Sequence, residues 1–364
     1  IAANDLDMKN SQNKLSASLL DRLKLTEQRI KSLAAAVREV AQLTDPTGRI
    51  LEEKTLPNGL QLQKLSVPLG VIGCIYEARP NVTVDIAAIA IKSGNAVALR
   101  GGSAAENTNR VLIEVIQAGL RQAGLPPQLV QTVDEYGREG AQQMMQARGL
   151  IDVLIPRGSA NLIQTVVNES KVPVIETGDG VVHIYVDSEV DESIVVPIVV
   201  NAKAQRPSVC NSLETLLIHQ AVAAKLLPLV AQALAEAGVT IHGCEKTQEI
   251  ISCVPATDED WSTEYLSLDL SIKVVQDLDE ALAHIAKYST HHTESILTSN
   301  KANAERFLAE NDSAVVMVNA STRFTDGGEF GFGAEVGIST QKLHARGPMG
   351  LRELTSSKWL VRGL

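Results

Sequence analysis

The sequence predicts a parallel α/β protein with two domains. Helical and strand patterns alternate along almost the whole chain, which is typical of parallel α/β folds. A chain of 364 residues is also longer than one ordinary domain. Hydrophobic residues make up 45% of the chain but aromatic residues only 3%, so aliphatic side chains must fill the core, as they do around buried parallel strands.

The first part of the chain predicts helices followed by a hairpin. Residues 16–43 have the pattern of one or two amphipathic helices, which end before Pro46. In Lys54–Lys64, the pair Asn58-Gly59 separates alternating leucines and indicates a type I′ turn. A hairpin inside an α/β chain often projects as an arm, so we expect this one to serve in oligomerisation.

Two alternating blocks follow the hairpin. In the first we predict strands over 69–75, 96–99, 151–155 and 172–175, and helices over 82–92, 103–124 and 160–167. Ser103 and Glu106 have the spacing of a capping box, which predicts a helix start at Ser103, with Leu112, Val115 and Ile116 on one face. In the second block, from about residue 178, we predict helices over 193–204 and 221–237, a strand over 213–219, a Gly-rich loop over 319–350 and a final strand over 358–361.

Composition argues against several classes of protein. The net charge of −10 argues against nucleic-acid and membrane-surface binding, which depend on basic residues. Four cysteines do not form a disulfide framework, and neither zinc-type spacing nor a membrane-spanning run is present. We therefore expect a cytoplasmic protein without a metal.

Two strand–Arg–Gly–Ser–helix junctions form the first candidate site. Glycine lets a ligand approach the backbone, and a helix N-terminus offers N–H groups to an anion. The candidate cofactor residues are Arg100, Gly101, Ser103, Arg157, Gly158 and Ser159. Arg100 and Ser103 suit a 2′-phosphate, which favours NADPH over NADH. Plain tight βα turns are the equally weighted alternative, since no dinucleotide fingerprint or P-loop motif occurs.

Cys210 and the loop from residue 319 are the other candidates. Cys210 follows a helix end in a polar stretch with Lys203 and Arg206, and nearby cations favour a reactive thiolate. A structural role for this cysteine is an equal alternative. The loop carries groups that can bind a zwitterionic acid, namely Ser321, Arg323, Asp326 and Glu329, although a solvated surface loop would also explain it.

These stretches together resemble the γ-glutamyl phosphate reductase family, a branch of the aldehyde dehydrogenase superfamily. The resemblance runs from about residue 3 to 364 and rests on motifs at 67–73, 76–83, 92–95, 99–102, 155–158, 183–187, 205–211, 319–328 and 341–351. It implies an aldehyde dehydrogenase-like fold with two doubly wound parallel-sheet domains and a hairpin arm. The expected parts are an NADPH domain (1–49 and 69–177), a catalytic domain (178–354) and an oligomerisation arm (50–68 and 355–364).

The resemblance also implies an activity and partners. The Cys210 thiolate would attack L-glutamyl 5-phosphate, and NADPH would reduce the thioester to L-glutamate 5-semialdehyde, the second step of L-proline biosynthesis. A homo-oligomer and functional coupling to glutamate 5-kinase are implied as well. The alternatives are another thioester-forming enzyme, such as a CoA-acylating aldehyde dehydrogenase, a catalytically silent oligomer, or the reductase half of a fused kinase–reductase.

The resemblance adds further site residues. Arg79, Asn81 and Asn211 are expected to bind the substrate, and Glu264 to hold the nicotinamide ribose. Arg323 would hold the α-carboxylate and Asp326 or Glu329 the ammonium, while Lys203 or Arg206 would hold the phosphate. Glu176 stands where hydrolytic aldehyde dehydrogenases keep a general base, and its role here stays open.

Overall fold

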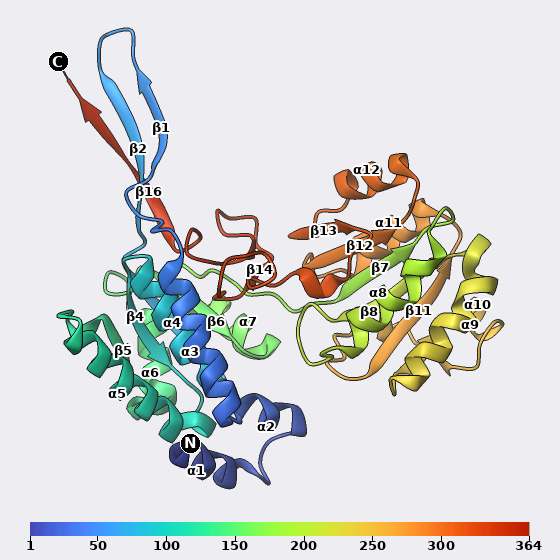
Figure 1. Ribbon diagram of the computed structural model, residues 1–364, viewed down its shortest axis with the longest axis horizontal. Coiled ribbons are helices and arrows are strands. Elements are labelled where there is room, and N and C mark those ends of the chain that lie inside the picture. Colours follow the sequence, from blue (N-terminus) through green and yellow to red (C-terminus); the bar gives the residue numbers. More distant parts are fainter. Residues whose placement is uncertain (364) are drawn as a thin grey trace. The chain divides into compact units, whose positions relative to one another are not determined.

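The chain forms three larger β-sheets, which belong to two compact units (Figure 1). The computed structural model describes residues 1–363, apart from the side chains of Ala17 and Ser18; Leu364, the last residue of the predicted arm, lies outside the described residues. One unit comprises Ile1–Thr177 with Phe330–Leu364, and the other Gly178–Glu329. Residues 330–354 thus pack with the first unit, whereas the sequence analysis placed them in the catalytic domain.

The first unit contains a four-stranded parallel sheet in the order β5-β4-β3-β6. Its elements are α1 (Ala2–Ser11), α2 (Ala17–Leu23), α3 (Glu27–Gln42), β3 (Val71–Tyr76), α4 (Pro80–Lys92), β4 (Ala96–Arg100), α5 (Glu106–Gln122), β5 (Val130–Thr132), α6 (Gly137–Gln146), β6 (Val153–Arg157) and α7 (Ala160–Glu169). Short strands β14 (Ile338–Ser339) and β15 (Gly347–Pro348) pair with each other. Because β4 and β6 lie on opposite sides of β3, the strand order reverses there, and such a reversal creates a crevice at the carboxyl ends of the strands.

Local sequence explains the helix that follows β3. Pro80 occupies the first position of α4, where its missing N–H costs nothing, and Gly94 lies just beyond the end at φ +75°. The buried side chains of α4 pack on β3 and β4 in one core that includes Ile86, Ile89 and Cys74. Burial raises the pKa of the Cys74 thiol to about 12, so this cysteine is an inert part of the core.

The arm is a three-stranded antiparallel sheet made of β1 (Ile50–Thr55), β2 (Gln61–Pro68) and β16 (Thr355–Arg362). Figure 1 shows it projecting from the first unit. The predicted hairpin is confirmed, but the type I′ turn is wrong. Gly59 N donates to Leu56 O, Leu56 N donates to Leu60 O, and Gly59 lies at φ +88°. This is a three-residue loop, which requires positive φ only at its last residue, so Asn58 keeps an ordinary conformation.

The second unit contains a seven-stranded parallel sheet in the order β10-β9-β11-β8-β7-β12-β13. Its elements are β7 (Val182–Val186), α8 (Glu192–Ala204), β8 (Leu213–His219), α9 (Gln220–Glu236), β9 (Thr240–Gly243), α10 (Glu245–Gln248), β10 (Val254–Pro255), β11 (Asp269–Val275), α11 (Leu278–Tyr288), β12 (Thr293–Leu297), α12 (Lys301–Glu310) and β13 (Val315–Val318). Its central strands β7 and β8 are buried apart from half-buried His219, as expected for mainly apolar strands inside a parallel sheet. The predicted fold class, two parallel sheets with covering helices and an arm, is confirmed.

Some local predictions are wrong. Ser103 starts a short 3₁₀ turn (Ser103–Ala105), and α5 begins after it without a side-chain cap, so the capping box does not form. Val115 is 64% exposed, and Ile113 and Leu120 form the buried face of α5 instead. Residues 172–175 form only one isolated bridge, through Val174. Among the described residues, no helix combines the length and apolar character needed to span a membrane.

Candidate active site

Cys210 lies in the loop between α8 and β8, at the amino end of the seven-stranded sheet. Ser212 Oγ lies 3.4 and 3.5 Å from the carbonyl oxygens of Ala202 and Lys203, which ties the two ends of this loop together. Gly180 passes so close that an added Cβ would lie 1.5 Å from the carbonyl oxygen of Cys210. Only glycine therefore fits at position 180. Cys210 itself is half-buried, unlike Cys74.

The segment after β13 returns to this same end of the sheet. Ser295 Oγ donates to the carbonyl oxygen of Ala320 at 2.7 Å, and Thr293 Oγ1 donates to Thr325 Oγ1 at 2.9 Å. Since Thr293 is the first residue of β12, residues 320–325 run back along this strand to its amino end. This brings the Arg323 region beside the Cys210 loop.

Asn211 joins the two segments directly. Its side-chain Nδ2 donates to the backbone carbonyl oxygen of Thr325 at 2.7 Å. Its backbone carbonyl oxygen accepts a hydrogen bond from Thr322 Oγ1 at 2.9 Å. Ser321 accepts from the backbone N–H of Arg323 at 3.3 Å and so caps the 3₁₀ turn Thr322–Phe324. Asn211 and Ser321 were predicted to bind the substrate. In the structure, these hydrogen bonds hold the loops around Cys210.

Charged groups gather around Arg323. Burial lowers the pKa of the Arg323 guanidinium, and the positive charge of Arg206 lowers this pKa further. The negative charges of Asp326, Glu329 and a Cys210 thiolate raise it. Four predicted site residues, Cys210 among them, therefore lie within electrostatic reach of Arg323. Arg323 Nε also donates to Gln205 Oε1 at 3.1 Å, which orients the guanidinium.

Lys203 does not join this group. Its Nζ lies 2.6 Å from Glu214 Oε2, and both side chains are fully buried. The prediction that Lys203 binds the substrate phosphate is therefore wrong, because the ammonium is already paired inside the unit. Glu214 was not predicted as a partner of Lys203, since a carboxylate inside a mainly apolar strand has no motif of its own. Glu264, predicted to hold the ribose, accepts a hydrogen bond from the backbone N–H of Gly180 at 2.8 Å.

The predicted cofactor junction at residues 157–159 lies where β3 and β6 end in the first unit. Glu77, which directly follows β3, accepts hydrogen bonds from the backbone N–H of Ser159 at 2.8 Å and from its hydroxyl at 3.0 Å. An added Cβ on Gly158 would lie 2.7 Å from a Glu77 carboxylate oxygen, so the backbone approach is tight. Glu77 was not predicted as a site residue, although it follows a strand at the reversal of strand order.

The junction after β4 is also tightly built. Arg100 Nε donates to the carbonyl oxygen of Gly137 at 3.2 Å, and Gly101 N donates to Asp134 Oδ1 at 2.6 Å. An added Cβ on Gly101 would lie 2.0 Å from Asn109 Nδ2, so glycine is required there. Ser103 is exposed at the start of its 3₁₀ turn. Arg100 thus supplies one guanidinium at this junction, with its Nε bonded to Gly137.

Arg157 is the last residue of β6 and so lies at the predicted cofactor junction of residues 157–159. An added Cβ on Gly337 would lie 2.2 Å from Arg157 Nη1. The charge of Arg157 partly offsets the rise that burial causes in the pKa values of Cys74 and Asp85. The assignment of Arg157 to a cofactor phosphate stays a prediction.

Two other predicted regions also lie in the first unit. Arg79 is the N-cap residue of α4, and Asn81 Nδ2 donates to Asp85 Oδ2 at 3.0 Å. Burial raises the pKa of Asp85 to about 6, and the hydrogen bond from Asn81 opposes this rise. Glu176 accepts side-chain hydrogen bonds from Gln164 at 3.2 Å and Gln341 at 3.3 Å.

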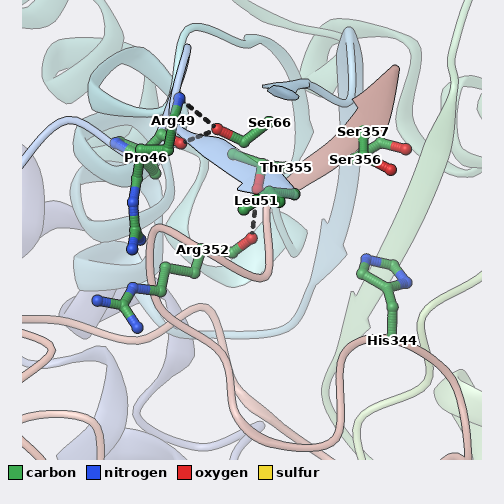
Figure 2. Close-up of a pocket in the computed structure, with 9 residues that line it drawn as sticks. All are labelled: Pro46, Arg49, Leu51, Ser66, His344, Arg352, Thr355, Ser356 and Ser357. Atoms are coloured by element: carbon green, nitrogen blue, oxygen red, sulfur yellow. Dashed lines mark hydrogen bonds between the residues drawn. The ribbon is translucent and has the colours of Figure 1, made fainter. Parts of the chain in front are cut away.

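A pocket of about 320 Å³ lies at the base of the arm. Figure 2 shows its lining residues, which are Pro46, Arg49, Leu51, Ser66, His344, Arg352, Thr355, Ser356 and Ser357. None of them is a predicted site residue, and all belong to the first unit. Within residues 1–363, no group of three or more His, Cys, Asp or Glu side chains is arranged to hold a metal ion.

Comparison with known proteins identifies the family to which the chain is similar. Residues 21–250 match the model of the aldehyde dehydrogenase family. A γ-glutamyl phosphate reductase of Clavibacter michiganensis is 62% identical over 100% of this chain and 84% of its own length. The crystal structure of a γ-glutamyl phosphate reductase from Thermotoga maritima superimposes with a TM-score of 0.96 at 47% identity, over 100% of this chain and 88% of that one. An engineered glycolyl-CoA reductase with bound NADP⁺ shares the fold at a TM-score of 0.70 and 16% identity, over 99% of this chain and 96% of that one.

Proposed function

The chain belongs to the γ-glutamyl phosphate reductase family within the aldehyde dehydrogenases, and from this premise we propose that Cys210 is the nucleophile of its reaction. It is an oxidoreductase of proline biosynthesis that uses a nicotinamide cofactor to reduce L-glutamyl 5-phosphate to L-glutamate 5-semialdehyde. One observation carries the residue assignment: Arg323 lies within electrostatic reach of the half-buried Cys210 and also of Arg206 and Asp326.

The first step forms a thioester. Cys210 Sγ attacks the acyl carbon, a C–S bond forms, and the bond from that carbon to the phosphate oxygen breaks, so phosphate leaves with the electron pair. Arg206 is the remaining candidate to neutralise the phosphate, since Lys203 is paired with Glu214. The planar fork of Arg323 suits the α-carboxylate of the substrate, and Asp326 or Glu329 the α-ammonium.

The second step releases the aldehyde. When bound, the cofactor supplies the hydride that converts the thioester to a thiohemiacetal. The oxyanion of this intermediate then re-forms the C=O bond of the aldehyde as the C–S bond breaks. Cys210 Sγ leaves with the electron pair of that bond, which restores the thiolate for the next turnover. The tight contact between Gly180 and the Cys210 carbonyl keeps the backbone of the loop in place through both steps.

The first unit has residues that fit NADPH. The N-terminus of α7, with Gly158 and Ser159, offers backbone N–H groups to a diphosphate. Arg100, at the end of β4, supplies a cation for a 2′-phosphate, and the residues that directly follow β4 are glycines and a serine rather than a carboxylate that would prefer a ribose hydroxyl. These features favour NADPH over NADH.

The arm supports a homo-oligomer. Its three strands expose Leu51, Trp359 and Val361 at 52%, 44% and 57%. A small exposed sheet with apolar side chains needs a partner surface, and a second copy of this chain would supply one. The four cysteines are free thiols, which is typical of cytoplasmic proteins. Functional coupling to glutamate 5-kinase there would shorten the time for which the labile acyl phosphate is exposed to water.

The reverse reaction tests the assignment of Cys210. Phosphate-dependent reduction of NADP⁺ with pyrroline-5-carboxylate should be measurable for the native protein and absent for Cys210→Ser, because serine is far harder to ionise. Cys244→Ser, at another half-buried cysteine of the same unit, is the matched control and should retain full turnover. Near-native turnover of Cys210→Ser, with an intact fold and cofactor binding, would disprove the thioester mechanism.

A further inference from the structure

A fully buried ion pair joins the two ends of the loop that carries Cys210. Lys203 lies in the last turn of α8 and Glu214 is the second residue of β8, so the pair spans the base of the loop. The Nζ–Oε2 distance is 2.6 Å, and neither side chain has any exposed surface. The second carboxylate oxygen of Glu214 accepts from the backbone N–H of Leu266 at 3.4 Å.

Stability alone does not explain this pair. Removing two charges from water is costly, and well-packed apolar side chains of similar volume often stabilise a core as well or better. Burial accordingly raises the pKa of Glu214 and lowers that of Lys203, while their mutual attraction opposes both shifts. What an ion pair adds over an apolar contact is a fixed distance and direction between two segments.

The surroundings of the pair extend to the backbone beside Cys210. Glu264 acts electrostatically on both Lys203 and Glu214, and its carboxylate accepts the hydrogen bond from Gly180 N at 2.8 Å. Gly180 in turn lies directly against the carbonyl oxygen of Cys210. On its other side, Lys203 Nζ lies 5.8 Å from the centre of the Tyr265 ring. The pair is therefore connected to the nucleophile loop both along the chain and across Gly180.

We propose that Lys203 and Glu214 form a positioning pair that holds the Cys210 loop in the geometry required for attack. The proposal rests on the assignment of Cys210 as the nucleophile. Neither residue touches the substrate; they act through the loop that they close. A small displacement of an attacking atom is sufficient to lower a rate strongly, so the pair should influence kcat much more than KM.

An apolar double variant separates positioning from stability. Lys203→Met combined with Glu214→Leu should keep the melting temperature within about 5 °C of native, because no charge is left unpaired. Its kcat in the pyrroline-5-carboxylate assay should nevertheless fall by about tenfold or more, with KM changed less than about threefold. The alkylation rate of Cys210 by iodoacetamide, followed on its peptide by mass spectrometry, should change by a similar factor.

The buried His183–Glu294 pair supplies the matched control. It lies in the same unit at 3.1 Å with both side chains fully buried, and it has no role in the proposed chemistry. His183→Leu with Glu294→Leu should leave kcat per folded molecule and Cys210 alkylation at native values. If both double variants lowered kcat equally, or if the Lys203/Glu214 double variant kept native kcat and alkylation, the positioning role would be refuted.

A more conservative single variant tests the positioning role if the apolar double variant does not fold. Glu214→Asp keeps the charge but withdraws the carboxylate by about 1.5 Å, one C–C bond. We expect a folded protein with the same loss of kcat, and native kcat would overturn the proposal. Failure of the Cys210 assignment is distinguishable, because Cys210→Ser would then stay active while alkylation still reports on the loop.

Discussion

The carboxylate of Glu77 accepts two hydrogen bonds from Ser159, one from the backbone N–H at 2.8 Å and one from the hydroxyl at 3.0 Å. Ser159 is the N-cap residue of α7, so a side-chain anion already occupies the helix end that we assign to the cofactor diphosphate. A diphosphate bound at this helix end would therefore compete with Glu77 for the N–H of Ser159. This relationship leads to the first of four predictions.

Glu77→Gln should strengthen cofactor binding. An anion at a helix N-terminus is worth ~0.3–1 kcal/mol, so removal of the competing charge should lower the Kd for NADP⁺ by about two- to fivefold. The free energy of unfolding should fall by a similar amount. Isothermal titration calorimetry measures the first effect and urea unfolding the second. Glu169→Gln, at the exposed far end of the same helix, is the control and should change neither. Weaker binding by Glu77→Gln would show that Glu77 itself contacts the cofactor.

Arg100→Ala should reduce the preference for NADPH. Loss of a charge-assisted contact should weaken NADPH binding by ~1.5–3 kcal/mol and NADH binding much less. Fluorescence titration with both cofactors measures the difference. Arg121→Ala, in the last turn of α5, removes an exposed cation from the same unit and should leave both affinities unchanged. Equal losses for both cofactors with Arg100→Ala would show that this side chain does not contact the 2′-phosphate.

Arg323→Ala should impair substrate capture. Binding energy from the α-carboxylate acts through positioning, so kcat/KM for glutamate semialdehyde should fall ~10²-fold or more. Arg323→Lys should recover only part of the loss, because an ammonium cannot reproduce the planar fork that Gln205 orients. Arg306→Ala, on the exposed side of α12, is the control. A simple aldehyde without the amino-acid group should be little affected; an equal loss for both substrates would make Arg323 structural.

Deletion of Thr55–Lys64 should lower the mass of the oligomer. The deletion removes the turn and the part of β2 that pairs with residues 359–362. It also removes Lys64, whose Nζ lies 5.7 Å from the centre of the Trp359 ring. Light scattering measures the mass. Asn58→Asp changes only the turn, keeps its acceptor for Leu60 N, and should retain the native mass. An unchanged mass after the deletion would exclude the arm from assembly.

Local pattern was sufficient to predict the elements and the class of fold. Buried strands such as Val71–Tyr76 are short, mainly apolar runs, and Pro80 and Gly94 mark the ends of a helix, so periodicity and turn chemistry place them. The capping box at Ser103 and the turn at Asn58 were wrong because several turn types share those residues. Local preference cannot choose between such alternatives without the surrounding structure.

By itself, the sequence determined the alternation of strands and helices, the hairpin and the candidate nucleophile Cys210, since each depends on residues close together in the chain. Only the tertiary structure decided which charges meet. Lys203 is near Cys210 in sequence, yet it pairs with Glu214 of β8 inside the core. Arg323 is distant in sequence, yet it lies within electrostatic reach of Cys210. A hydrogen bond between Asn211 and Thr325, 114 positions apart, brings the two segments together. Such pairing depends on which distant segments pack together and on the free-energy cost of burying an unpaired charge. The local sequence pattern determines neither of these.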